Sequence, residues 1–252
     1  MRRENGAWGK MKISIIIPAY NEEGRIERTV RAYHQFFSEK QQQNNLAFEL
    51  VIVLNGCKDK TLRVVEQVRN DLGSQIIVIN LREAGKGLAI KAGFADALTR
   101  ENDLIGFVDA DMATAPTAFY DLIMNSNNAD GVIASRYMPG AKITPERPAY
   151  KRWGSRLIYE PYVWLLFGLS YYDYQCGAKL FKRAVIERIT PQLTVAQWAF
   201  DVELLYLCKK NGFIIKEIPT VWHDQADSKL TLRGGLRMFG ALFDVWKRHK
   251  KL

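Results

Sequence analysis

The chain has 252 residues, 48% of them hydrophobic and 25% charged, which is an ordinary globular composition. Its net charge of +9 suits nucleic acid, anionic lipid or phosphorylated substrates and does not choose among them. Its three cysteines match neither a zinc spacing nor a disulfide framework, which favours a reducing compartment.

No stretch approaches the roughly 20 apolar residues of a membrane span. The N-terminus also lacks the apolar region of a signal peptide, so we expect a cytoplasmic protein that lies at most on the inner face of a membrane. No Pro/Ser/Gly-rich linker divides the chain. We therefore expect one main domain over residues 1–230 and a C-terminal helix and tail over 231–252.

Short apolar runs alternate with amphipathic segments along the first half of the chain. Buried strands are expected at 12–17, 50–54, 76–79 and 104–108, with helices between them. Asn21 is expected to cap the first helix, with Glu22 and Glu23 in its first turn. This alternation predicts an α/β fold with a doubly wound, mostly parallel sheet.

The fourth expected strand ends in two carboxylates, Asp109 and Asp111. Residues i and i+2 of an extended segment point the same way, so both can face a ligand while Ala110 faces the protein. Open α/β sheets bind ligands at this end of their strands. The pair predicts a magnesium or manganese site shared with diphosphate oxygens. The alternative is a strand-to-helix turn in which one aspartate is the N-cap.

The second half begins with an expected strand at 131–136, followed by a polar loop over 139–148 that is either a lid or a plain surface loop. Arg152 and Ser155 then lie one helical turn apart, and arginine forks suit phosphate oxygens. The alternative is a solvated basic face. The apolar run at 159–174 fits either a buried helix or one at a membrane interface.

Residues 232–246 place apolar side chains at three- or four-residue spacing among many basic residues. This pattern predicts a basic amphipathic helix that anchors the protein to a membrane surface. The alternative is a C-terminal helix packed on the sheet. We expect no nucleic-acid partner, because the chain shows no recognition-helix or aromatic-platform pattern.

The segments 15–23, 55–61, 85–87 and 108–111 resemble the family 2 inverting glycosyltransferases of the GT-A fold. Four further segments look like stretches of dolichyl-phosphate β-glucosyltransferases: 175–181, 198–205, 218–223 and 228–230. The resemblance covers about residues 12–230. It implies a Rossmann-like GT-A fold and transfer of a hexose, from UDP-glucose, to a polyprenyl or dolichyl phosphate with Mg²⁺ or Mn²⁺.

The resemblance also implies two sets of binding residues. The nucleotide-sugar set is Pro18, Tyr20, Glu22, Asn55, Lys86, Asp109 and Gln175. The acceptor-phosphate set is Arg136, Arg152, Ser155, His223 and Lys229. Asn55 departs from the family pattern, because it replaces the usual acidic residue with an amide that both donates and accepts, so reading of the base may differ.

In the implied mechanism, a cation at Asp111 and Asp109 neutralises the diphosphate as it leaves. A phosphate-monoester acceptor is already ionised near pH 7 and needs no strong base. A sugar-hydroxyl acceptor needs one, and Asp201 is then the candidate, although it is equally explained as a helix N-terminal acid.

Several other functions fit parts of the same pattern. Within the family, the acceptor is alternatively a sugar hydroxyl of a polysaccharide or glycolipid, or the donor is GDP-mannose. Outside it, the chain could be a nucleotide-sugar-binding protein without turnover. A nucleotidylyltransferase is disfavoured, because residues 18–21 replace the Gly-rich phosphate loop expected after the first strand.

Overall fold

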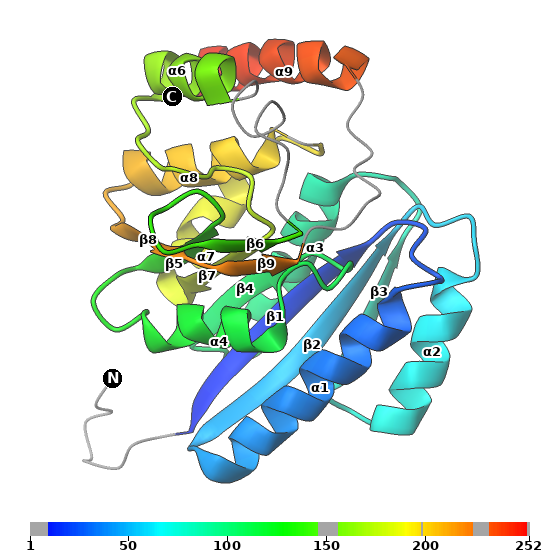
Figure 1. Ribbon diagram of the computed structural model, residues 1–252. Helices are drawn as coiled ribbons and strands as arrows, with labels where there is room; N and C mark the ends of the chain where they lie inside the picture. Colours follow the sequence, from blue (N-terminus) through cyan, green and yellow to red (C-terminus); the bar gives the residue numbers. More distant parts are fainter. Residues whose placement is uncertain (1–9, 146–155, 198, 224–231, 251–252) are drawn as a thin grey trace.

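A seven-stranded sheet in the order β3-β2-β1-β4-β7-β5-β8 forms the centre of the protein (Figure 1). The computed structural model describes residues 10–145, 156–197, 199–223 and 232–250. The strands of this sheet are β1 (Met11–Ala19), β2 (Leu46–Asn55), β3 (Ile76–Leu81), β4 (Leu104–Val108), β5 (Gly131–Ser135), β7 (Ala178–Lys182) and β8 (Ile215–Pro219). A second, two-stranded parallel sheet pairs β6 (Lys142–Thr144) with β9 (Val221–His223).

Helices cover both faces of the main sheet, and each face has its own buried cluster. One face carries α1 (Ile26–Gln43), α2 (Thr61–Leu72) and α4 (Pro116–Met124). The other carries α3 (Lys86–Leu98), α6 (Arg156–Phe167), α7 (Arg183–Ile189), the short 3-10 helix η1 (Thr190–Gln192), α8 (Phe200–Lys210) and α9 (Leu232–Lys250). Successive strand residues point to opposite faces, so β1 supplies Ile15 to one cluster and Ile16 to the other. The predicted doubly wound fold is confirmed.

Most neighbouring strands are parallel, and β7 is the exception. It lies between β4 and β5 and runs antiparallel to both. The sequence pattern did not predict this strand, because Lys179 interrupts its apolar run. In the structure Lys179 is fully buried, and its Nζ lies 2.6 Å from Oδ1 of Asp201. The ion pair therefore allows a lysine to occupy a buried strand.

The predicted cap of the first helix is wrong. Helix α1 begins at Ile26, and Arg25 occupies the N-cap position. Asn21 instead adopts a left-handed backbone conformation, with φ of 53°, which asparagine tolerates better than most residues. Its Oδ1 accepts a hydrogen bond of 2.8 Å from the backbone N–H of Lys58. Asn21 thus joins the loops that follow β1 and β2.

The first part of the apolar run at 159–174 lies in α6, which ends at Phe167 and lies beside α9 at the top of Figure 1. The hydroxyl of Tyr162 donates to the backbone oxygen of Phe239 at 3.2 Å, and their ring centroids lie 5.1 Å apart. Leu242 and Val245 of α9 are buried in the cluster that also contains α8. The C-terminal helix therefore packs on the body of the protein. In the described part of the chain, no helix is both long and apolar enough to cross a membrane.

Candidate active site

Asp109 and Asp111 follow directly after β4, at the edge where the parallel strands end. Ala110 between them is buried, whereas both aspartates are partly exposed, as the alternation predicted. Asp109 donates its backbone N–H to the oxygen of Gly177 at 3.1 Å. A Cβ atom at Gly177 would lie 1.9 Å from Oδ2 of Asp109, so only glycine leaves room for this carboxylate.

The alternative role for the pair, a strand-to-helix turn, is correct in one respect only. Oδ1 of Asp111 accepts the backbone N–H of Ala113 at 2.9 Å, which stabilises the turn. The N-cap of α4, however, is Ala115, so neither aspartate caps that helix. Oδ1 of Asp111 thus forms a hydrogen bond within the turn. The Asp111 side chain as a whole remains partly exposed.

Lys86, the first residue of α3, places its Nζ 2.6 Å from Oδ1 of Asp109. Burial lowers the pKa of Lys86, but the carboxylates of Asp109, Asp201 and Asp111 outweigh burial and raise it above its ordinary value. Burial and the charge of Asp109 raise the pKa of Asp111. The pair of carboxylates is therefore a place where added positive charge is favourable.

This donor set fits a hard divalent cation that completes its ligand shell from a bound diphosphate. Two carboxylates on one short loop are the oxygen ligands that magnesium and manganese prefer. Within the described residues, no group of three or more His, Cys, Asp or Glu is arranged to ligate a metal. A cation between Asp109 and Asp111 would thus need further oxygens from its substrate.

The two glycines around Lys86 serve a contact within the protein. A Cβ at Gly85 would lie 2.6 Å from the backbone oxygen of Ala196, and one at Gly87 would lie 2.3 Å from that of Val195. Residues 195–196 therefore pack closely against the backbone of this Gly-Lys-Gly segment. That contact fixes where α3, and hence Lys86, begins.

Asn55 ends β2 and is 3% exposed. Its Nδ2 donates to the backbone oxygen of Ala19 at 2.9 Å, and its Oδ1 accepts the N–H of Gly85 at 3.1 Å. A carboxylate could not donate to Ala19, so the departure from the family pattern has a structural reason. The described bonds of Asn55 link the ends of β1 and β2 to the start of α3, and its contact with a nucleotide stays a prediction.

The other residues expected to bind the nucleotide lie around the end of β1. Pro18 is buried within the strand, and Tyr20 directly after it is 39% exposed. The carboxylate of Glu22 accepts two bonds from Arg25, at 2.7 and 2.9 Å. Gln175 lies two residues before Gly177, and its Nε2 is 3.1 Å from the sulfur of Met238 in α9. The fold thus brings Tyr20 and Glu22 to the same edge of the sheet as Asp109.

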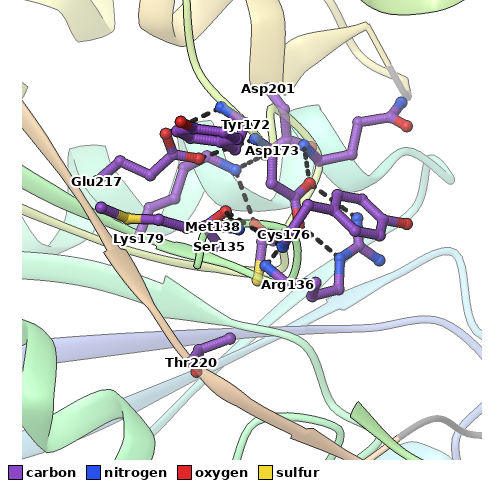
Figure 2. A network of polar contacts seen from close by, with 12 residues as sticks. Ser135, Arg136, Met138, Tyr172, Asp173, Cys176, Lys179, Asp201, Glu217 and Thr220 are labelled. Carbon is purple, nitrogen blue, oxygen red and sulfur yellow. Dashed lines mark hydrogen bonds and ion pairs between the residues drawn. The ribbon is translucent and has the colours of Figure 1, made fainter. Parts of the chain in front are cut away.

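Arg136, expected to bind the acceptor phosphate, forms an ion pair within the protein. Its guanidinium forms a fork with Asp173, with Nε to Oδ2 at 2.7 Å and Nη2 to Oδ1 at 2.9 Å (Figure 2). The Asp173 side chain is buried and that of Arg136 is 12% exposed, and the ring of Trp222 lies 5.0 Å from the guanidinium carbon. Burial would raise the pKa of Asp173, but Arg136 holds it below its ordinary value. In this structure the guanidinium is paired with a carboxylate of the same chain, and a contact of Arg136 with the acceptor phosphate stays a prediction.

Asp201 also forms an ion pair within the protein, with Lys179. Its side chain is 5% exposed, and Lys179, 2.6 Å away, donates a second bond to the backbone oxygen of Cys176 at 2.8 Å (Figure 2). One oxygen of this carboxylate is therefore occupied by the lysine, and little of the side chain is open to a substrate. Asp201 lies in the first turn of α8, as the alternative role required. The geometry therefore gives no support to Asp201 as a general base.

His223 lies next to the aspartate turn. Its backbone N–H donates to the oxygen of Ala113 at 2.9 Å, and Trp222 forms a bridge with Thr114. The three remaining residues of the expected acceptor set lie outside the described residues: Arg152, Ser155 and Lys229.

Three residues in or beside this site were missed by sequence reasoning. Gly177 seats Asp109, Asp173 binds Arg136, and Lys179 binds Asp201. The sequence could have pointed to Gly177 and Lys179, because both lie in the segment 175–181 that carries the family resemblance. Asp173 lies just before that segment, and its partner is 37 positions away.

Comparisons with known proteins identify the family of this chain. A model described as glycosyl transferase family 2 matches residues 14–190. The dolichyl-phosphate beta-glucosyltransferase of Drosophila melanogaster is 32% identical over 253 residues, covering 95% of this chain and 76% of that protein. The enzyme of that description from Homo sapiens is 32% identical over 229 residues, covering 87% of this chain and 69% of that protein.

Solved structures show the same fold. Mannosyl-3-phosphoglycerate synthase from Rubrobacter xylanophilus matches with a TM-score of 0.69 at 16% identity, covering 95% of this chain and 74% of that one. Glucosyl-3-phosphoglycerate synthase from Mycobacterium tuberculosis, crystallised with Mn²⁺, UDP and phosphoglyceric acid, matches with a TM-score of 0.66 at 15% identity, covering 93% of this chain and 77% of that one. The GT-A fold and the resemblance are confirmed: this chain belongs to glycosyl transferase family 2 and is a glycosyltransferase.

Proposed function

We propose that this glycosyltransferase moves glucose from UDP-glucose to a polyprenyl phosphate, such as dolichyl phosphate, with inversion at the anomeric carbon. The names of the relatives at 32% identity support the sugar and the acceptor. One structural observation favours a phosphate acceptor over a sugar hydroxyl: the candidate base, Asp201, is bound to a buried lysine. A phosphate monoester is ionised near pH 7 and attacks without a general base.

We assign the donor diphosphate to the edge of the sheet where Asp109, Asp111 and Lys86 meet. Asp109 and Asp111 would hold a magnesium or manganese ion, which when bound stabilises the negative charge that develops on the leaving diphosphate. Lys86 lies 2.6 Å from Asp109 and is kept protonated by the surrounding carboxylates, so it adds a fixed positive charge beside the phosphates. We assign Tyr20, which follows β1 and is 39% exposed, to the base of the nucleotide.

We place the protein on a membrane surface, because a polyprenyl phosphate is held there. The outer face of α6 supports this proposal: Ile158, Trp164 and Leu165 are 67%, 61% and 72% exposed, although all three are large and apolar. Neighbouring α9 carries exposed Lys247 and Lys250 near its end. Apolar side chains flanked by cations are the pattern of an interfacial helix on anionic lipid.

The test is turnover by purified protein with Mg²⁺ or Mn²⁺, offered UDP-glucose or GDP-mannose, with and without a short polyprenyl phosphate. We expect release of UDP that depends on the lipid phosphate, and a glucosyl phosphate product with inverted configuration. Release that requires a sugar hydroxyl acceptor, or that occurs only from GDP-mannose, would overturn the proposed substrate while leaving the family assignment intact.

A further inference from the structure

The side chain of Glu203 in α8 is fully buried. It contacts two other segments of the chain, residues 194–195 and the end of α9. Its carboxylate accepts the backbone N–H of Thr194 at 3.1 and 3.0 Å, the hydroxyl of Thr194 at 2.5 Å and the N–H of Val195 at 2.9 Å. It also lies 2.8 Å from Nε2 of His249, near the end of α9. A buried carboxylate is tolerated only when its oxygens are satisfied in this way.

Thr194 and Val195, which Glu203 binds, belong to the segment 193–197 that contacts the start of α3. The oxygen of Ala196 accepts the N–H groups of Gly87 and Leu88, at 2.9 and 3.3 Å. Nε2 of Gln197 donates to the oxygen of Ala84 at 3.1 Å. Residues 193–197 thus contact both sides of Lys86, and this contact is the reason for the two flanking glycines.

His249 connects Glu203 to the C-terminal helix, α9. The imidazole is 1% exposed and lies in bonding distance of Glu203, and Nη1 of the adjacent Arg248 donates to the hydroxyl of Thr194. Lys210 of α8 donates to the backbone oxygen of His249 at 2.7 Å. The end of α9 is therefore bound to the carboxylate that also holds residues 194–195.

We propose that Glu203 is a positioning residue for donor binding, and that His249 couples the end of α9 to it. Glu203 holds residues 193–197 against the first turn of α3, and this turn places Lys86 beside Asp109. The C-terminal helix thereby helps to set the position of Lys86, the side chain that we assign to the donor. The inference rests on the proposed function in one respect, the contact between Lys86 and the donor.

The experiment compares wild type with His249→Ala and His249→Gln, by hydrogen exchange and by nucleotide-sugar affinity. In His249→Ala, the amides of Gly87 and Leu88 are expected to exchange about tenfold faster. The dissociation constant for UDP-glucose should rise about tenfold, with the KM for the acceptor within about twofold of wild type. His249→Gln keeps a side-chain N–H donor and should recover most of both effects.

His34→Ala is the matched control, because Nε2 of His34 makes one side-chain bond of 2.9 Å, to Gln75, on the opposite face of the sheet. It should leave exchange at Gly87 and Leu88 unchanged. Glu203→Gln provides a second perturbation of the same contacts. The proposal is overturned if folded His249→Ala and Glu203→Gln both keep wild-type exchange at these amides and wild-type affinity for UDP-glucose. Exchange is measured on the free protein, so it tests the coupling even where the acceptor proves to be different.

Discussion

Replacing Asp173 by Ala should cost the protein much of its stability. Asp173 is 2% exposed in its side chain, and four donors bond to it: the backbone N–H and both fork nitrogens of Arg136, and the backbone N–H of Gln175. Breaking a buried ion pair by removing one partner costs about 3–5 kcal/mol, because the remaining charge is left uncompensated. We expect a loss of this size in urea unfolding followed by circular dichroism.

The exposed pair of Arg31 and Glu27 is the matched control. Its side chains are 37% and 54% exposed, and the residues lie four apart on α1, so Glu27→Ala should cost only about 0.3–0.5 kcal/mol. A loss of under about 1 kcal/mol for Asp173→Ala would refute the reasoning, because it would mean that the buried pair contributes no more than a surface one.

The same pair predicts a dependence on pH. Arg136 holds the pKa of Asp173 below its ordinary value, so the carboxylate binds its proton less readily in the folded state. Its contribution to stability is therefore complete above the unfolded-state pKa of about 3.9 and is lost as the pH falls through the lower folded-state pKa. The difference in unfolding free energy between wild type and Asp173→Ala should shrink over that acidic range.

The pair also separates a structural role of Arg136 from a substrate role. Arg136→Met should lower stability, while the KM for the acceptor, measured on folded protein, should stay within about twofold of wild type. A tenfold rise in that KM without a loss of stability would place Arg136 in the acceptor-phosphate site.

Three further predictions concern the donor and membrane sites. Asp111→Ala should lower kcat/KM by at least about a hundredfold in saturating Mg²⁺, and chelation of the metal should have a similar effect on wild type. Gly87→Ala should raise the KM for UDP-glucose, because its Cβ would lie 2.3 Å from a backbone oxygen, whereas Gly24→Ala, with nothing within 4 Å, should not. Replacing Trp164 and Leu165 by Ser should reduce co-sedimentation with anionic vesicles and leave UDP-glucose affinity unchanged.

Each of these has an outcome that would contradict it. Full activity of Asp111→Ala in the presence of a chelator would end the metal assignment. Equal kinetics for the two glycine variants would mean that the contact with residues 195–196 can relax without moving Lys86. Unchanged vesicle binding after the double replacement on α6 would remove the structural support for a membrane-facing surface there.

The sequence by itself determined the class of fold and the place of the site. Apolar runs of β-branched residues and their spacing are local properties, so the alternation of strands and helices could be predicted before any contact was known. The position of Asp109 and Asp111 at a strand end followed from the same pattern, and the ordered motifs identified the family.

Only the tertiary structure decided what the polar side chains do. Arg136 and Asp173 are 37 positions apart, and Lys179 and Asp201 are 22 apart, so no local pattern reveals that they pair. Their pairing depends on β7 lying between β4 and β5, an antiparallel strand that hydrophobic periodicity did not predict because it contains a lysine. An arginine or lysine in a sequence does not show whether it binds a substrate phosphate or forms an ion pair with a carboxylate of the protein. The partners of a charged side chain, and therefore the balance of charge around it, are decided only when the chain folds.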